Sequence, residues 1–180
     1  HGPDLLRGKR SSYEGGTRVP LLIRWPGKAR AQVREELVST MDLMPTILAA
    51  SGAAAVPNLP GRSLVPLLAG EQPAWREYLF TEFHTHAAKA NFFPQRALHG
   101  KRYKLIENLL PDEANPDMEK IDKELPFVAA AVAAAKPEVR AAYQLQQRPP
   151  RYELYDLQTD PYEFRNLTAS PEHATVFADL

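Results

Sequence analysis

Residues 8–27 read GKRSSYEGGTRVPLLIRWPG, a polar, glycine-bearing loop followed by an apolar run that closes on Pro-Gly. The loop holds the ingredients of an oxyanion site. Lys9 offers a compact positive charge, and serine hydroxyls and backbone N–H groups beside glycine can donate to tetrahedral oxygens. A solvated surface loop with an ion pair between Glu14 and Arg18 explains the same residues. The residues alone leave both interpretations open.

The segments that follow this loop predict a strand and then a helix. Val19 to Trp25 is an apolar run of β-type residues and predicts a short buried strand. Residues 42–51 predict a helix, because Asp42 stands at the N-cap position and Gly52 ends the apolar pattern. A strand followed by a helix is typical of a layered α/β sheet.

The pattern changes near residues 70–75. The strands predicted after that point are 78–83, 96–99, 103–106 and 152–157, the middle two joined by a tight turn at Gly100-Lys101. A short helix or turn is predicted at 63–69, and helices are predicted in pieces within 112–147 that are cut by Pro116, Pro126 and Pro137, and at 171–180. Adjacent strands with helices gathered between them predict a small α+β domain with an antiparallel sheet.

Composition excludes several classes of protein. The 180 residues include 22 Lys plus Arg and 22 Asp plus Glu, so no bulk charge favours nucleic acid or an acidic membrane surface. The absence of cysteine excludes disulfides, zinc-thiolate sites and a thiol nucleophile in this stretch. No apolar run is long enough to predict a membrane span. The chain opens on His1 without an initiator Met, and we expect a piece of a longer protein.

Several blocks in the first half resemble successive carboxy-terminal motifs of the sulfatase family, which shares the alkaline-phosphatase-like fold. These blocks are HG at 1–2, GKRSSYEGGTRVPLLIRWPGK at 8–28, LVSTMDLMPTILAASG at 37–52 and LPGRSLVPLLAG at 59–70. The second half resembles the heparan N-sulfatase (sulfamidase) type, through TEFHTH at 81–86, FPQRAL at 93–98, KRYKLIENL at 101–109 and YELYDLQTDPYEFRNL at 152–167. The resemblance implies that residues 1–74 end the catalytic α/β domain and that residues 75–180 form a carboxy-terminal α+β subdomain, cut short at its last helix.

The resemblance also implies roles for two residues of the first half. Lys9 matches the lysine that binds the sulfate oxygens and stabilises charge as the ester or sulfamate bond breaks. His1 matches the second residue of a metal motif that holds calcium in this type of sulfatase. Calcium prefers oxygen ligands, so a histidine leaves open both direct ligation and the identity of the metal.

His84 and His86 stand where the heparan N-sulfatase type supplies a histidine to the substrate pocket. An imidazole can hydrogen-bond a sugar hydroxyl or pair with a sulfate, and two residues separated by one position in a strand share a face. A polar surface turn is the alternative. We expect Arg96 to pair with a neighbouring carboxylate, and Tyr13 and Glu14 to shape the loop that presents Lys9.

The family's nucleophile, a formylglycine made from a Cys/Ser-x-Pro-x-Arg motif, has no counterpart in this sequence. The resemblance therefore implies a sulfatase that depends on calcium, or another divalent metal, and on a nucleophile upstream of this chain. These 180 residues alone are expected to be inactive. The implied partner is a sulfated sugar or another sulfate ester, and the implied location is periplasmic, secreted or lysosomal. A phosphodiesterase or phosphonate hydrolase of the same superfamily, and a non-catalytic glycan-binding fragment, remain alternatives.

Overall fold

The computed structural model describes residues 7–85 and 89–180, which form two compact units. We call residues 7–19 and 80–180 together the sheet unit, and residues 20–79 the helical unit. The predicted domain boundary between residues 74 and 75 stays a prediction.

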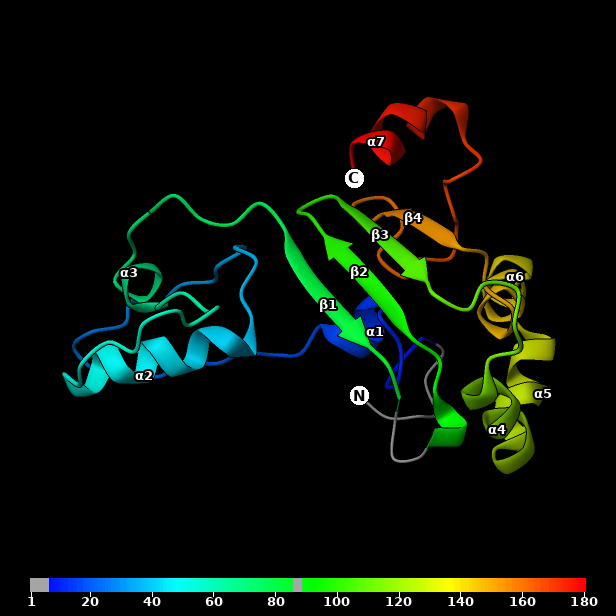
Figure 1. The fold of residues 1–180 in the computed structure, drawn as a ribbon, viewed down its shortest axis with the longest axis horizontal. Coiled ribbons are helices and arrows are strands. Elements are labelled where there is room, and N and C mark those ends of the chain that lie inside the picture. Colours follow the sequence, from blue (N-terminus) through cyan, green and yellow to red (C-terminus); the bar gives the residue numbers. More distant parts are fainter. Residues whose placement is uncertain (1–6, 86–88) are drawn as a thin grey trace. The chain divides into compact units, whose positions relative to one another are not determined.

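Figure 1 shows the elements along the chain. The strands are β1 (Leu79–Phe83), β2 (Gln95–His99), β3 (Tyr103–Asn108) and β4 (Tyr152–Asp156). The α-helices are α1 (Glu14–Thr17), α2 (Leu43–Ser51), α3 (Val65–Leu68), α4 (Pro116–Glu124), α5 (Pro126–Ala134), α6 (Pro137–Gln147) and α7 (Ala174–Asp179). Short 3-10 turns are η1 (Thr40–Asp42), η2 (Lys89–Asn91) and η3 (Pro171–His173). No helix among the described residues is long and apolar enough to cross a membrane.

The four strands form one sheet in the order β1-β2-β3-β4, which confirms the predicted strands to within a few residues. Strand β3 pairs antiparallel with β2 and with β4. Gly100 N donates to Tyr103 O at 2.8 Å and closes the predicted turn between β2 and β3. Strand order therefore follows chain order across the sheet, although three helices separate β3 from β4.

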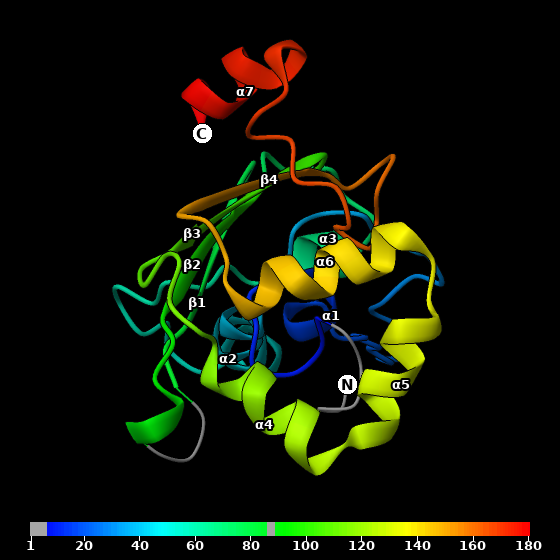
Figure 2. The same ribbon diagram turned by 90° about the vertical axis from the view of Figure 1, so that its right-hand side faces the viewer.

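Three helices lie between β3 and β4 in the sequence, and each begins at one of the prolines that divide the segment. Proline suits the first helical position because its missing N–H has no partner there in any case. Met118, Val128 and Tyr143, one from each helix, form a buried apolar cluster. Figure 2 shows the three helices following one another beside the sheet. They form a second small core within the sheet unit.

The inner face of the sheet carries both polar and apolar side chains. The strand registers align Gln95 with Asn108, Ala97 with Ile106 and Glu153, and His99 with Lys104 and Tyr155. Tyr13, which precedes α1 in the chain, packs with Ala97 and Ile106 of the middle row and with Tyr155 of the third row. The segment around α1 thus covers the inner face of the sheet.

The helical unit confirms the helix predicted at 42–51, now α2. Its carboxyl end closes on Gly52, whose φ of 69° is the left-handed conformation that glycine adopts freely. The side chain of Asp42 does not cap α2, however. Asp42 accepts from the backbone N–H of Ser39 and of Arg62, at 2.8 Å each, and forms a buried ion pair with Arg76 at 2.6 Å. The Asp42 carboxylate thus joins the backbone at Ser39 and at Arg62 to the side chain of Arg76.

The strand predicted at Val19 to Trp25 is absent, and this α/β feature of the sequence analysis needs correction. The segment has no regular secondary structure, and no described residue pairs with it in a ladder. A strand exists only where a neighbour satisfies its N–H and C=O groups. The apolar side chains are correspondingly exposed, Leu22 to 93%. Among its described residues, the helical unit has no strand before β1.

Candidate functional site

Lys9 lies in a tightly folded loop. Arg7 and Arg10, on either side of it, have positive φ values of 57° and 76°. The Ser11 hydroxyl donates to the carbonyl oxygens of Gly8 at 2.8 Å and Arg7 at 3.2 Å, closing the loop behind Lys9. Lys9 is exposed, and within residues 7–85 and 89–180 it has no hydrogen bond or ion pair. The Ser11 side chain therefore helps to hold the loop, while the Lys9 ammonium group stays exposed.

Two glycines let α1 approach this loop. A Cβ on Gly15 would lie 2.6 Å from the Arg7 carbonyl oxygen, and one on Gly16 would lie 2.3 Å from that of Ser11. Both distances are shorter than any real carbon–oxygen contact, so a larger residue forces the backbone to move. The close packing of α1 on this loop therefore requires glycine at positions 15 and 16.

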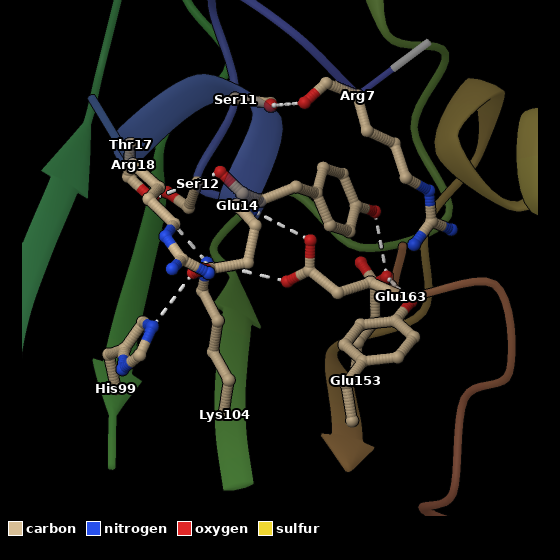
Figure 3. A network of polar contacts seen from close by, with 12 residues as sticks. Arg7, Ser11, Ser12, Glu14, Thr17, Arg18, His99, Lys104, Glu153 and Glu163 are labelled. Atoms are coloured by element: carbon tan, nitrogen blue, oxygen red, sulfur yellow. Dashed lines mark hydrogen bonds and ion pairs between the residues drawn. The ribbon is translucent and has the colours of Figure 1, made fainter. Parts of the chain in front are cut away.

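Ser12, Tyr13 and Glu14, at the start of α1, contact successive rows of the sheet, and Figure 3 shows Glu14 beside His99 and Lys104 of the third row. Ser12 N donates to the side chain of Gln95 at 3.1 Å, in the first row. Tyr13 Oη donates to Glu153 at 2.7 Å, in the middle row. The third row receives the carboxylate of Glu14. The sequence Ser-Tyr-Glu therefore binds the sheet in register.

Glu14 is the centre of a buried charge network. Its carboxylate lies 2.8 Å from His99 Nε2 and 3.0 Å from Lys104 Nζ. Burial would raise the pKa of Glu14, but hydrogen bonds from His99 and Lys104 and their charges outweigh it and lower this pKa to about 2. The Glu14–Arg18 pair of the surface-loop interpretation exists only at 3.9 Å, with Arg18 largely exposed. Glu14 is thus a structural anchor.

Glu163 completes the network from the loop after β4. Its carboxylate accepts from the backbone N–H of Glu14 at 2.7 Å and lies 3.3 Å from Lys104 Nζ. Burial raises the pKa of Glu163 despite that ammonium and that N–H. Lys104 is therefore a fully buried cation between two carboxylates.

A second buried group fixes the start of the loop. The Arg7 guanidinium lies over the ring of Tyr13, 4.1 Å from its centre, and 5.3 Å from the centre of the Tyr155 ring. Burial and the nearby Glu153 carboxylate raise the pKa of Tyr13 well above its usual value, so the phenol stays neutral and donates. The expectation that Tyr13 and Glu14 shape the loop presenting Lys9 agrees with these contacts.

The second predicted group lies at the end of β1. His84 is about half exposed, and its Nε2 atom lies 3.7 Å from Glu82. Arg96 Nε donates to the same carboxylate at 3.1 Å, which confirms the expected pairing of Arg96. His84 O accepts from Phe93 N at 2.9 Å and fixes the backbone there. No hydrogen bond or ion pair joins His84 to Lys9 among the described residues.

Two predicted site residues, His1 and His86, lie outside the described residues. Among the residues that the structure describes, no three His, Cys, Asp or Glu side chains gather in a way that could hold a metal ion. The described part of the chain thus does not supply a metal site by itself.

Sequence reasoning missed His99, Lys104 and Glu163. Strand β3 alternates, and Lys104 shares the buried face of Ile106 and Asn108. A lysine on an apolar face normally predicts the opposite orientation, since lysine is rarely buried unpaired. The available signal was a pair of carboxylates, Glu14 and Glu163, in motifs far apart in the sequence.

Comparison with known proteins places these features in a family. Residues 5–125 match the family model described as "N-sulphoglucosamine sulphohydrolase, C-terminal". The N-sulphoglucosamine sulphohydrolase of Homo sapiens is 30% identical over 96% of this chain and 37% of its own length. The chain spans about a third of the length of the curated relatives it matches.

Solved structures resemble the chain over nearly its full length. A candidate sulfatase from Bacteroides thetaiotaomicron matches 94% of this chain and 29% of its own, with a TM-score of 0.66 and 26% identity. The phosphonate monoester hydrolase of Silicibacter pomeroyi matches 96% of this chain and 29% of its own, with a TM-score of 0.64 and 26% identity. Both kinds of enzyme contain this arrangement of sheet and helices.

Proposed function

Because this chain belongs to the sulfatase family, as a carboxy-terminal portion of the alkaline-phosphatase-like type, we propose that the complete protein hydrolyses sulfate esters or N-sulfates of a sulfated sugar. The observation that carries the proposal is the Lys9 loop. An exposed ammonium stands on a loop whose neighbours are buried and hydrogen-bonded. A cation on a backbone held in this way suits the recognition of a sulfate group.

The proposed role of Lys9 is to bind sulfate oxygens and to hold the charge that develops as the ester or sulfamate bond breaks. Preorganised donors stabilise a transition state without the cost of reorganisation. The buried network beneath the loop supplies that preorganisation, because Glu14 and Tyr13 are each fixed to the sheet. Lys9 thus contributes charge, and the sheet contributes its position.

His84, with His86, is proposed to contact the sugar. Its half-exposed imidazole can donate to a hydroxyl or a second anionic group. Glu82 lies 3.7 Å from His84 Nε2, and Arg96 adds a cation beside the same carboxylate. This group would select the sugar, whereas Lys9 would bind the group that is cleaved.

The nucleophile and the metal belong to the proposal but not to the described residues. Formylglycine would supply the attacking hydroxyl, and calcium or another divalent ion would supply charge at the sulfate; both are expected from segments outside this chain. His1 is a proposed contributor to the metal site. Residues 1–180 alone are accordingly proposed to release no sulfate.

The finer fold assignment is also a proposal. We infer that residues 19–25 and the surfaces of α2 are covered by other parts of the catalytic α/β domain. Their exposed apolar side chains support this inference, because exposed apolar patches of this kind usually mark interfaces.

The test compares Lys9→Ala with Lys101→Ala in the complete protein. Lys101 lies exposed in the turn before β3 and serves as the matched control. Lys9→Ala should lower kcat/KM on an N-sulfated or O-sulfated glucosamine by about 10²–10³-fold, the usual loss for one charge-stabilising donor. Near-parental activity of Lys9→Ala would overturn the proposal.

A second candidate is a phosphonate or phosphate ester hydrolase. The structural likeness to a phosphonate monoester hydrolase favours it, because sulfate and phosphonate esters present similar oxygens to the same lysine. Paired aryl sulfate and aryl phosphonate substrates separate the two candidates. A higher kcat/KM on the phosphonate would reverse their order.

A further inference from the structure

Both ends of the Lys9 loop are held by the helices α4 and α6. Before Lys9, Arg7 donates from Nη2 to the carbonyl oxygen of Ala142 in α6 at 3.3 Å. After it, Arg10 donates from Nη1 to Asp117 Oδ1 in α4 at 2.9 Å. The segment between β3 and β4 thus holds the loop at two points.

The two helices that hold the loop are joined to each other by hydrogen bonds. Asn115, just before α4, donates from its side chain to Gln146 O in α6 at 3.3 Å, and its backbone N–H donates to Gln147 O at 2.9 Å. The start of α4 and the end of α6 are therefore tied together. Connected helices therefore contact the chain on both sides of Lys9.

Asp117 is the most specific part of this grip. Its side chain is 5% exposed and that of Arg10 is 15% exposed, so the pair is largely screened from water. Asp117 Oδ2 has no hydrogen bond among the described residues, which leaves Arg10 as the recorded side-chain partner of this carboxylate. The left-handed backbone of Arg10 turns its side chain toward α4 and costs strain that the ion pair offsets.

We propose that Asp117 is a positioning residue of the proposed sulfatase reaction, which acts through Arg10 to hold Lys9 against the sulfate group. The inference rests on the proposed function, since it gives Asp117 a task only if Lys9 binds the reacting group. This proposal gives the segment that contains α4, α5 and α6 a role in activity as well as in packing. A displaced catalytic group loses rate steeply with distance.

The experiment is a double-mutant cycle of Asp117→Asn and Lys9→Ala in the complete protein, with kcat/KM as the readout. Asp117→Asn should lower kcat/KM by about tenfold to a hundredfold in the parent. In the Lys9→Ala background it should change kcat/KM by less than about twofold, because the group that it positions is gone. Glu119→Gln is the matched control, since Glu119 lies exposed on the same helix.

The failures are distinguishable. Normal activity of Lys9→Ala contradicts the proposed function itself. A Lys9→Ala loss together with no loss for Asp117→Asn, or with an equal loss in both backgrounds, overturns the positioning role alone. If Asp117→Asn unfolds the protein, Arg10→Gln removes the same ion pair from the loop side. Hydrogen exchange of residues 8–12 should then be about fivefold faster or more in Arg10→Gln than in Glu119→Gln, and equal exchange overturns the role.

Discussion

The sheet unit and the helical unit differ in which residues they bury. On the inner face of the sheet, Lys104, Glu153 and Glu163 are at most 1% exposed, and each has a charged or hydroxyl partner. In the helical unit, Leu22 and Val33 are each 93% exposed. One unit has buried its charges, and the other has left large apolar side chains in water.

This difference shows how far the contacts within each unit account for its structure. The sheet unit satisfies its buried charges with its own residues, so the contacts around Glu14 specify the loop without help. The helical unit has one such network, at Asp42 and Arg76. It also exposes large apolar side chains, and surfaces of this kind usually mark interfaces. The structure of the Lys9 loop can thus be explained from this chain alone, whereas that of residues 19–25 cannot.

Lys104→Met should have the largest effect on stability. It leaves Glu14 and Glu163 buried beside each other without their cation, and breaking a buried pair costs about 3–5 kcal/mol. Urea unfolding of the complete protein measures the change. Lys101→Met, in the exposed turn, should cost less than about 0.5 kcal/mol. Equal losses of unfolding free energy for Lys104→Met and Lys101→Met would contradict a special role for the buried network.

Acid should loosen the same network. The folded-state pKa of Glu14, about 2, lies below the ordinary 4.5, so the native state binds fewer protons than the unfolded state between these values. The stability that Glu14 contributes is present above pH 4.5 and is lost as pH falls toward 2, on the order of 3 kcal/mol in total. Unfolding free energies at several pH values, for the parent and for Glu14→Gln, measure this slope.

Glu163 acts in the opposite sense. Its raised pKa means that the native state holds the proton more tightly, so its contribution to stability improves as pH falls through that pKa. Glu163→Gln should therefore steepen the acid loss, and Glu14→Gln should flatten it. A slope that neither variant changes would contradict the assignment of the titration to this network.

Gly16→Ala should cost about 1–3 kcal/mol, the usual range for overpacking, since its Cβ would meet the Ser11 carbonyl oxygen. Activity should fall as well, because Ser11 closes the loop behind Lys9. Thermal unfolding and kcat/KM check the two effects. Gly27 has open space around its Cβ position but a φ of 74°, so Gly27→Asn, which tolerates that conformation, should be nearly neutral.

Leu22→Ser should have the smallest effect on residues 1–180, below about 0.5 kcal/mol, because the side chain is already in water. In the complete protein it should cost about 1.5–3 kcal/mol if other segments cover it. Urea unfolding of both proteins gives the comparison. Equal small costs would show that residue 22 stays exposed.

Prediction from the sequence succeeded where a local rule decides the structure. Pro116, Pro126 and Pro137 each begin a helix, as their missing N–H groups require, and Gly52 ends α2. The alternating strands formed the expected antiparallel sheet. These features depend on a few neighbouring residues.

Prediction failed where distant residues decide. Burial of Lys104 depends on carboxylates 90 residues before it and 59 residues after it, so the pattern of β3 alone gave no sign of it. The apolar run from Val19 predicted a strand, but a strand needs a partner that the described residues do not provide. The Lys9 loop was identified by motif, whereas the contacts that hold it required the structure.

The sheet fixes the loop that presents Lys9 through the contacts of Glu14 with His99 and Lys104. The most direct measurement is a double-mutant cycle of Glu14→Gln and Lys104→Met on the unfolding free energy. Two side chains in one buried network should couple by about 1.5–3 kcal/mol, so the double variant should be more stable than the sum of the single losses predicts. Additive losses, within about 0.5 kcal/mol, would contradict the account.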